Sequence, residues 1–154
     1  MSRLLAICAL LALSGCGTPE SKELQVFADA FREANKATEI EPMLALYELE
    51  GSTEQTINLL KNTLLYELGL PIRSIDFEPL SGAPEETIRF EHQEIEYVAT
   101  IEPLLRMRVR YETEDGFESL FSIGQNAAAE WRIVSSRPVA QSLVGARLVT
   151  PAVR

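Results

Sequence analysis

Residues 104–112 read LLRMRVRYE, and this stretch decides the fold class because no other part of the chain alternates so regularly. Apolar side chains at positions 105, 107, 109 and 111 oppose charged side chains at positions 106, 108, 110 and 112. A strand directs successive side chains to opposite faces, so this period of two predicts a β-strand with one buried face and one polar face.

Shorter alternating runs on both sides of this stretch predict further strands. We expect them over residues 72–79, 87–92, around Tyr97, and over 117–123 and 131–135. Glu114-Asp115-Gly116 is a strong hairpin signal between two of these runs, and Gln93-Glu94 is a second turn. Consecutive strands joined by tight turns indicate an antiparallel sheet.

Helical spacing dominates the chain before residue 72. A first helix carries apolar residues at Leu24, Phe27, Ala28, Phe31 and Ala34. A second helix begins near Pro42 and carries Met43, Leu46, Tyr47 and Leu49. A third opens with a capping box of Ser52 and Gln55, carries Ile57, Leu60, Leu64 and Leu68, and stops at Gly69 and Pro71. Helices followed by strands predict an α+β fold, with the N-terminal helices packed on one face of a curved antiparallel sheet.

This order of elements resembles the nuclear-transport-factor-2-like superfamily, which is also called cystatin-like or cone-shaped. The likeness is carried by the opening helix with Phe27 and Phe31, the arginine-rich strand after a hairpin at His92, and a last strand with Trp131. It covers residues 22–137. The resemblance implies a cone-shaped domain in a superfamily that hosts isomerases, dehydratases and transport adaptors.

The N-terminal residues predict where in the cell the protein is located. Arg3, the uncharged run over residues 4–13 and small residues before Cys16 are the parts of a secretory signal. Leu13-Ser14-Gly15-Cys16 resembles the lipobox of bacterial lipoproteins, which implies cleavage after Gly15 and lipid on Cys16. We therefore expect a signal peptide over residues 1–15, a lipidated cysteine and tether over 16–21, the domain over 22–137 and a tail over 138–154.

The signal peptide and the lipobox together predict a membrane-anchored protein of the bacterial cell envelope that faces the periplasm. Gly17 stands where lipoproteins retained in the inner membrane commonly carry aspartate, so the outer membrane is favoured. The lipid has to supply the membrane affinity, because an acidic chain is not attracted to anionic lipid head groups.

Composition excludes several functions. The 154 residues hold 14 basic and 23 acidic side chains, a formal charge of −9, which argues against nucleic acid as a partner. Cys8 leaves with the signal and Cys16 is committed to lipid, so no thiol remains for a disulfide or for catalysis. With one histidine and no free cysteine, we expect no metal site and no cofactor.

The resemblance implies that an enzyme of this kind would hold an aspartate or histidine beside a tyrosine inside the cone. The chain offers Asp76, His92, Tyr47, Tyr97 and Tyr111. A base in an apolar site gains proton affinity. His92, however, stands beside a turn and Asp76 on the polar face of its strand, where solvated side chains are expected. Tyr47 and Tyr111 lie on apolar stripes, which predicts core residues with a hydroxyl at the rim.

Arg106, Arg108 and Arg110 share one face of one strand. Guanidinium groups suit carboxylates and phosphates, so the stripe could bind an anion or an acidic partner. Cross-strand ion pairs explain it equally well, and we favour them, with Glu91, Glu118 and Glu130 as available acids.

Three functions follow from these observations. The leading hypothesis is a non-catalytic binding or interaction module that takes a small hydrophobic ligand or a protein partner. The alternatives are a small isomerase- or dehydratase-like enzyme with Asp76 or His92 as base, and a homodimeric structural scaffold.

Overall fold

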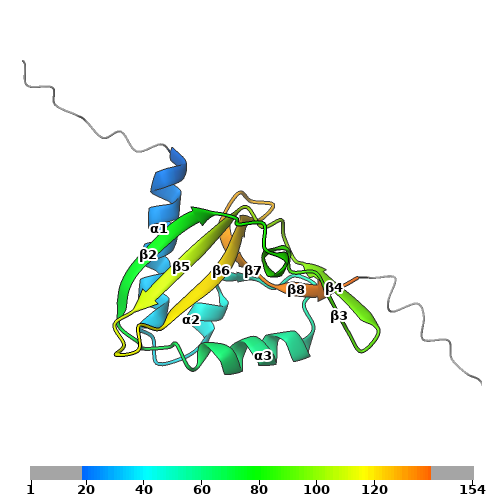
Figure 1. Cartoon of the computed structure of the whole chain (residues 1–154), viewed down its shortest axis with the longest axis horizontal. Helices are drawn as coiled ribbons and strands as arrows, with labels where there is room; N and C mark the ends of the chain where they lie inside the picture. The colour runs from blue at the N-terminus through cyan, green and yellow to red at the C-terminus, as the bar shows by residue number, and fades with distance from the viewer. Residues whose placement is uncertain (1–18, 140–154) are drawn as a thin grey trace, which may run out of the picture.

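Five strands build the main sheet, in the spatial order β1-β7-β6-β5-β2. The computed structural model describes residues 19–139 (Figure 1). The strands of this sheet are β1 (Tyr47–Glu48), β2 (Ile72–Pro79), β5 (Leu105–Tyr111), β6 (Glu118–Gln125) and β7 (Trp131–Val134). Neighbouring strands run antiparallel except β1 and β7, which are parallel. The predicted α+β class with a mostly antiparallel sheet is confirmed.

Three helices cover one face of this sheet. They are α1 (Pro19–Asn35), α2 (Glu41–Leu44) and α3 (Glu54–Leu64). In Figure 1, α1 stands behind β2, β5 and β6, and α3 lies across one end. Phe31 of α1 packs on Phe121 of β6 with ring centroids 5.5 Å apart. Because apolar residues alternate along β5, the same face presents Met107, Val109 and Tyr111, all almost fully buried.

A second sheet of three short strands has the order β3-β4-β8. Its strands are β3 (Phe90–His92), β4 (Ile95–Ala99) and β8 (Ser136–Pro138), and a 3₁₀ helix, η1 (Pro84–Thr87), precedes it. The chain passes from β7 of the first sheet to β8 of the second at Ser135. There the backbone N–H of Ser135 donates to the hydroxyl of Thr100 at 3.0 Å, and the Thr100 N–H donates to the Ser135 carbonyl at 3.0 Å.

Several predicted boundaries are wrong for identifiable reasons. The second helix stops at Leu44, because Tyr47 and Glu48 leave it to pair with Ile133 and Val134 of β7. The cap of α3 is Thr53, whose side chain accepts from the Thr56 N–H at 3.1 Å.

Ser52, the expected cap, has a different role. Its hydroxyl donates to the carbonyl of Ser136 at 2.9 Å and so ties the loop before α3 to β8.

Three other boundaries also differ. The first helix begins at Pro19, so it takes up part of the tether expected over residues 16–21. The strand expected over residues 87–92 begins only at Phe90, because Ile88 adopts a left-handed conformation after η1. The segment after residue 135 forms β8, which reaches into the tail expected from residue 138. No helix within residues 19–139 is long and apolar enough to cross a membrane.

Candidate functional site

A cavity of about 330 Å³ lies where β6 is not covered by β7. β7 pairs only with residues 123–125 of β6, so within residues 19–139 the start of β6 pairs with β5 on one edge and has no strand on the other. We call this cavity the α3 pocket. It is lined by Tyr47, Leu60, Thr63, Glu67, Glu85, Ile88, Ser119, Leu120, Phe121, Ser122, Ile133 and Val134.

A buried carboxylate belongs to the wall of the α3 pocket. Glu67 is only 7% exposed, although no basic side chain within residues 19–139 pairs with it. Its two oxygens instead accept hydrogen bonds from two hydroxyl groups, that of Tyr111 at 2.8 Å and that of Ser119 at 2.8 Å. Hydrogen bonds to an ionised acceptor are stronger than neutral ones, so this pair of donors offsets much of the cost of burial.

The local chain path explains why Glu67 points inward. After α3 the backbone continues in a helical turn, in which the N–H of Glu67 bonds the carbonyl of Leu64 at 3.0 Å. Positions three apart lie on one face of such a turn. Glu67 therefore follows Leu64, which is 2% exposed, into the interior.

Tyr47 supplies a hydroxyl group to the same space. Its ring is buried, and among residues 19–139 its hydroxyl makes no hydrogen bond. Burial, and secondly the negative charge of Glu67, raise the pKa of Tyr47 well above its ordinary value. The pKa of Tyr111 is raised by the same two causes in the same order. Both tyrosines thus stay protonated at any physiological pH, and Tyr47 presents a donor to the pocket.

The charges around the α3 pocket are acidic. Glu67 and Glu85 are among its lining residues, and no lysine, arginine or histidine in the described chain lines it. The remaining lining is apolar or hydroxyl-bearing. Such a pocket disfavours a carboxylate or phosphate and suits an apolar body that carries a hydroxyl or amine.

The residues that the sequence offered as bases lie elsewhere. Asp76 is on the opposite face of the sheet, where its carboxylate bonds the guanidinium of Arg110 at 2.5 Å. His92 ends β3 in the second sheet and is exposed. Tyr97 is buried on β4 of the second sheet, and its ring stacks on that of its cross-strand partner Phe90. Of the expected residues, only Tyr47 lines the α3 pocket, and Tyr111 lies behind its wall, where its hydroxyl bonds Glu67. Both tyrosines are buried core residues, as predicted.

The arginine stripe forms a ladder of ion pairs on the sheet face turned away from the helices. We call it the arginine ladder: Arg106, Arg108 and Arg110 with Asp76, Glu78, Glu86 and Glu118. Glu78 sits between two guanidinium groups, with oxygens 2.5 Å from Arg106 and 2.8 Å from Arg108. Hydrogen bonds from Arg108 and then from Arg106 lower the pKa of Glu78 to about 2.

The acids of this ladder were predicted only in part. Glu118 is confirmed as a partner, whereas Glu130 pairs with Arg132 at 2.6 Å and Glu91 belongs to the second sheet. Glu78 and Glu86 are the partners instead of Glu91 and Glu130. Glu78 lies opposite Arg106 in the pairing of β2 with β5, and Glu86 reaches Arg106 from η1, which folds over the end of β5. Since each guanidinium already has a carboxylate partner, the ladder is not an open anion site.

Sequence reasoning did not single out Glu67. A signal was present, because Glu67 lies three residues after Leu64 and seven after Leu60 on the apolar stripe of α3. A charged residue at an apolar helical position predicts a buried polar contact.

No group of three or more histidine, cysteine, aspartate or glutamate side chains in the described residues could hold a metal ion. Cys16 lies outside the described residues. Comparison of the chain with family models, with curated proteins and with solved structures finds no match.

Proposed function

We propose that this chain is a lipid-anchored protein of the bacterial cell envelope that binds a small apolar ligand in the α3 pocket without transforming it. The observation that carries the proposal is the arrangement of Glu67 and Tyr47. A fixed buried acceptor and an unpaired donor lie within one largely apolar cavity. Most ligand pockets have this character, with an apolar lining and a few fixed polar groups.

The ligand's chemistry follows from these two groups. Each Glu67 oxygen already accepts one hydrogen bond, and a carboxylate oxygen has capacity for another. A ligand hydroxyl can donate to Glu67 and accept from Tyr47, and a ligand amine can donate to Glu67. The acidic lining adds a Coulombic preference for the amine.

Binding rather than catalysis is proposed because Glu67 is held in place. A general base takes a proton from the substrate, and that proton would weaken the two hydrogen bonds that hold Glu67, because a protonated carboxyl group accepts hydrogen bonds less strongly than a carboxylate. Both oxygens of Glu67 are engaged by Tyr111 and Ser119, and neither Asp76 nor His92 reaches the pocket.

We also propose that the domain is of the nuclear-transport-factor-2-like type. The order β1-β7-β6-β5-β2, with all three helices on one face and a pocket between the sheet and α3, supports this assignment. The lipid anchor is proposed from the lipobox at Cys16.

A matched set of probes tests the ligand proposal. Cyclohexylmethylamine, cyclohexylmethanol and cyclohexanecarboxylate share one ring and differ only in the polar group. Each is titrated into the detergent-solubilised full chain while the amide signals of Thr63 and Ser119 are followed by NMR. We expect saturable shifts with the amine and the alcohol but not with the carboxylate.

Two variants sharpen the result. Tyr47→Phe removes one hydrogen bond and should weaken binding of the alcohol about two- to tenfold. Tyr66→Phe is the control, because Tyr66 is 82% exposed on the turn that carries Glu67 and does not line the pocket. Equal binding of all three probes, or unchanged binding to Tyr47→Phe, would refute the proposal. Conversion of a bound probe to a product would refute its non-catalytic part.

A further inference from the structure

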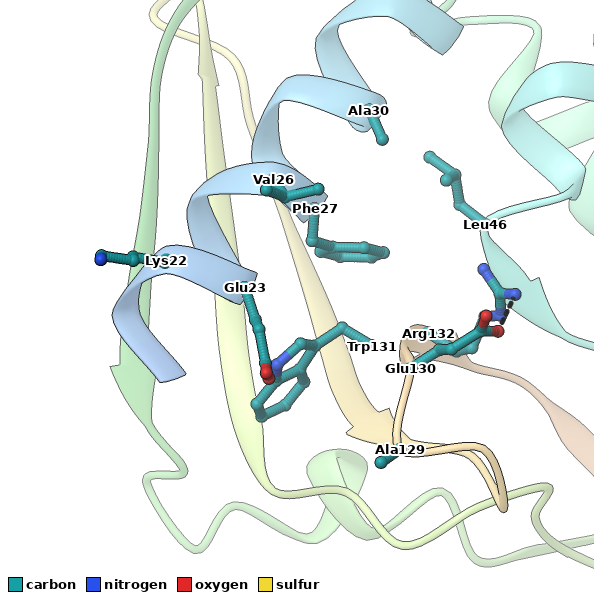
Figure 2. A pocket seen from close by; sticks show the side chains of 10 residues that line it. All are labelled: Lys22, Glu23, Val26, Phe27, Ala30, Leu46, Ala129, Glu130, Trp131 and Arg132. Carbon is teal, nitrogen blue, oxygen red and sulfur yellow. Dashed lines mark hydrogen bonds and ion pairs between the residues drawn. The ribbon is translucent and has the colours of Figure 1, made fainter. Parts of the chain in front are cut away.

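A second cavity, of about 480 Å³, runs between the first half of α1 and the start of β7 (Figure 2). We call it the α1 groove. It is lined by Lys22, Glu23, Val26, Phe27, Ala30, Leu46, Ala129, Glu130, Trp131 and Arg132. None of these residues lines the α3 pocket.

The floor of the α1 groove is apolar. Figure 2 shows side chains from three segments around one space, with Phe27 and Ala30 from α1, Leu46 from the loop before β1 and Trp131 from β7. Val26 lines the edge of the groove and is 69% exposed. An apolar floor beside an exposed apolar lip is the surface of a binding groove.

Trp131 gives the groove a specific polar group. The residue is only 6% exposed, and its indole nitrogen is buried without a hydrogen-bond partner in residues 19–139. A buried donor left unpaired costs about 1–3 kcal/mol, so such groups are rare unless a ligand or solvent completes them. The occupant of the groove should therefore be apolar and carry an oxygen acceptor.

The position of the groove along the chain indicates where that occupant comes from. α1 begins at Pro19, three residues after Cys16, and the groove begins at Lys22. Six residues span at most about 20 Å when extended. The lipid proposed on Cys16 would hold the α1 groove within that distance of the membrane surface.

We propose that the α1 groove binds an acyl chain of the bilayer in which the protein is anchored, with the Trp131 indole N–H donating to the ester carbonyl of that lipid. Tryptophan is enriched at the depth where acyl chains meet their polar heads, because its ring is apolar and its N–H is a donor. Lys22 is on the α1 side of the groove, and its side chain points outward from the helix, away from the apolar floor (Figure 2). The anchored domain then lies against the bilayer through α1 instead of swinging from its tether. This inference rests on the proposed anchor.

Trp131 is the only tryptophan of the chain, so its fluorescence reports directly on the groove. The full, lipidated chain is reconstituted into vesicles of phosphatidylethanolamine and phosphatidylglycerol that carry brominated acyl chains. Bromine quenches tryptophan only on close approach. We expect Trp131 to lose most of its emission, relative to vesicles of the same lipids without bromine.

Val26→Asp places a charge on the lip of the groove and should restore the emission. Leu59→Asp is the matched control, since Leu59 is 67% exposed on α3 and outside the groove, and it should remain quenched. Both sites are exposed, so neither change removes core packing. Unquenched Trp131 in a chain that floats with the vesicles would overturn the proposal, and so would equal quenching in Val26→Asp.

A separate arm distinguishes failure of the groove from failure of the anchor. The full chain with Cys16→Ser is titrated with a soluble, short-chain brominated phosphatidylcholine. Quenching of Trp131 here, together with failure of the unaltered chain to float with vesicles, would reject the anchor but keep an acyl-binding groove. Absence of quenching here would reject the groove whatever the anchor does.

Discussion

The hydroxyl of Tyr111 donates a 2.8 Å hydrogen bond to the carboxylate of Glu67 in the interior, where the two residues are 1% and 7% exposed. Tyr111→Phe keeps the ring and removes this donor, so half of the hydrogen bonding of the buried carboxylate is lost. We expect the free energy of unfolding to fall by about 1–3 kcal/mol, measured by urea denaturation. Tyr66→Phe should leave it unchanged, and an equal loss in both variants would contradict the assigned role of Glu67.

The arginine ladder predicts an acid-sensitive stability. The pKa of Glu78 is lowered from 4.5 to about 2 by its two arginine partners, so the folded state binds this proton less readily than the unfolded state. The stabilisation by Glu78 is therefore complete at a pH above the pKa that Glu78 has in the unfolded chain, and it is lost as the pH falls toward about 2. Unfolding of Glu78→Gln should depend less on pH across this window. The Glu78 carboxyl signal in NMR should titrate near the lower end, and a midpoint near 4.5 would refute the prediction.

Gly124 is required by a close backbone approach. A Cβ atom at this position would lie 2.1 Å from the carbonyl oxygen of Glu102, a contact that backbone atoms cannot relieve by rotation. We expect Gly124→Ala to disturb the pairing of β6 with β7 and to destabilise the fold strongly. Gly82→Ala is the comparison, because Gly82 has a φ of +84° but nothing within 4 Å. It should lose only about 1–2 kcal/mol in thermal unfolding, clearly less than Gly124→Ala.

Thr53 caps α3 with its hydroxyl oxygen, which accepts from the Thr56 N–H. Thr53→Ala should lower the free energy of unfolding by about 1 kcal/mol. Thr53→Ser retains the oxygen and should restore most of this loss, as followed by circular dichroism during heating. Full stability of the alanine variant would show that the cap does not contribute.

Cys16→Ser removes the thiol that a lipid would need. If the lipobox assignment holds, the variant stays uncleaved after Gly15, and its mass includes the first fifteen residues. Mass spectrometry of the protein recovered from cells measures this directly. Cleavage of the serine variant after Gly15, with continued sedimentation in the membrane fraction, would refute the anchor.

Periodicity predicted the centre of the sheet well because neighbouring residues alone determine it. The alternation over residues 105–111 and 72–79 gave both strands and their buried faces, and the turn at Gln93-Glu94 was also found. The short strand at Tyr47 could not be read in this way. Leu46 and Tyr47 lie on a helical stripe in the sequence, and only their distant partner Ile133 makes the segment a strand.

The candidate site depended even more on tertiary structure. The arginine ladder was half predictable, since Glu118 follows an obvious hairpin, whereas Glu86 reaches Arg106 only because η1 folds across the sheet. The α3 pocket exists because β7 leaves β6 early, which no local pattern encodes. Glu67 was missed for the same reason, because its partners are remote in sequence from α3.

The parallel pairing of β1 with β7 has a consequence for the order in which the molecule assembles. Residue 47 leaves the ribosome, or a translocation pore, long before residue 133, yet the backbone N–H of Ile133 bonds the carbonyl of Leu46 at 2.8 Å. Contacts between such distant segments form late and slow the folding reaction. Until β7 emerges, the start of the chain has helices without a finished sheet to cover. A nascent chain stopped before Trp131 should therefore expose apolar surface and depend on chaperones.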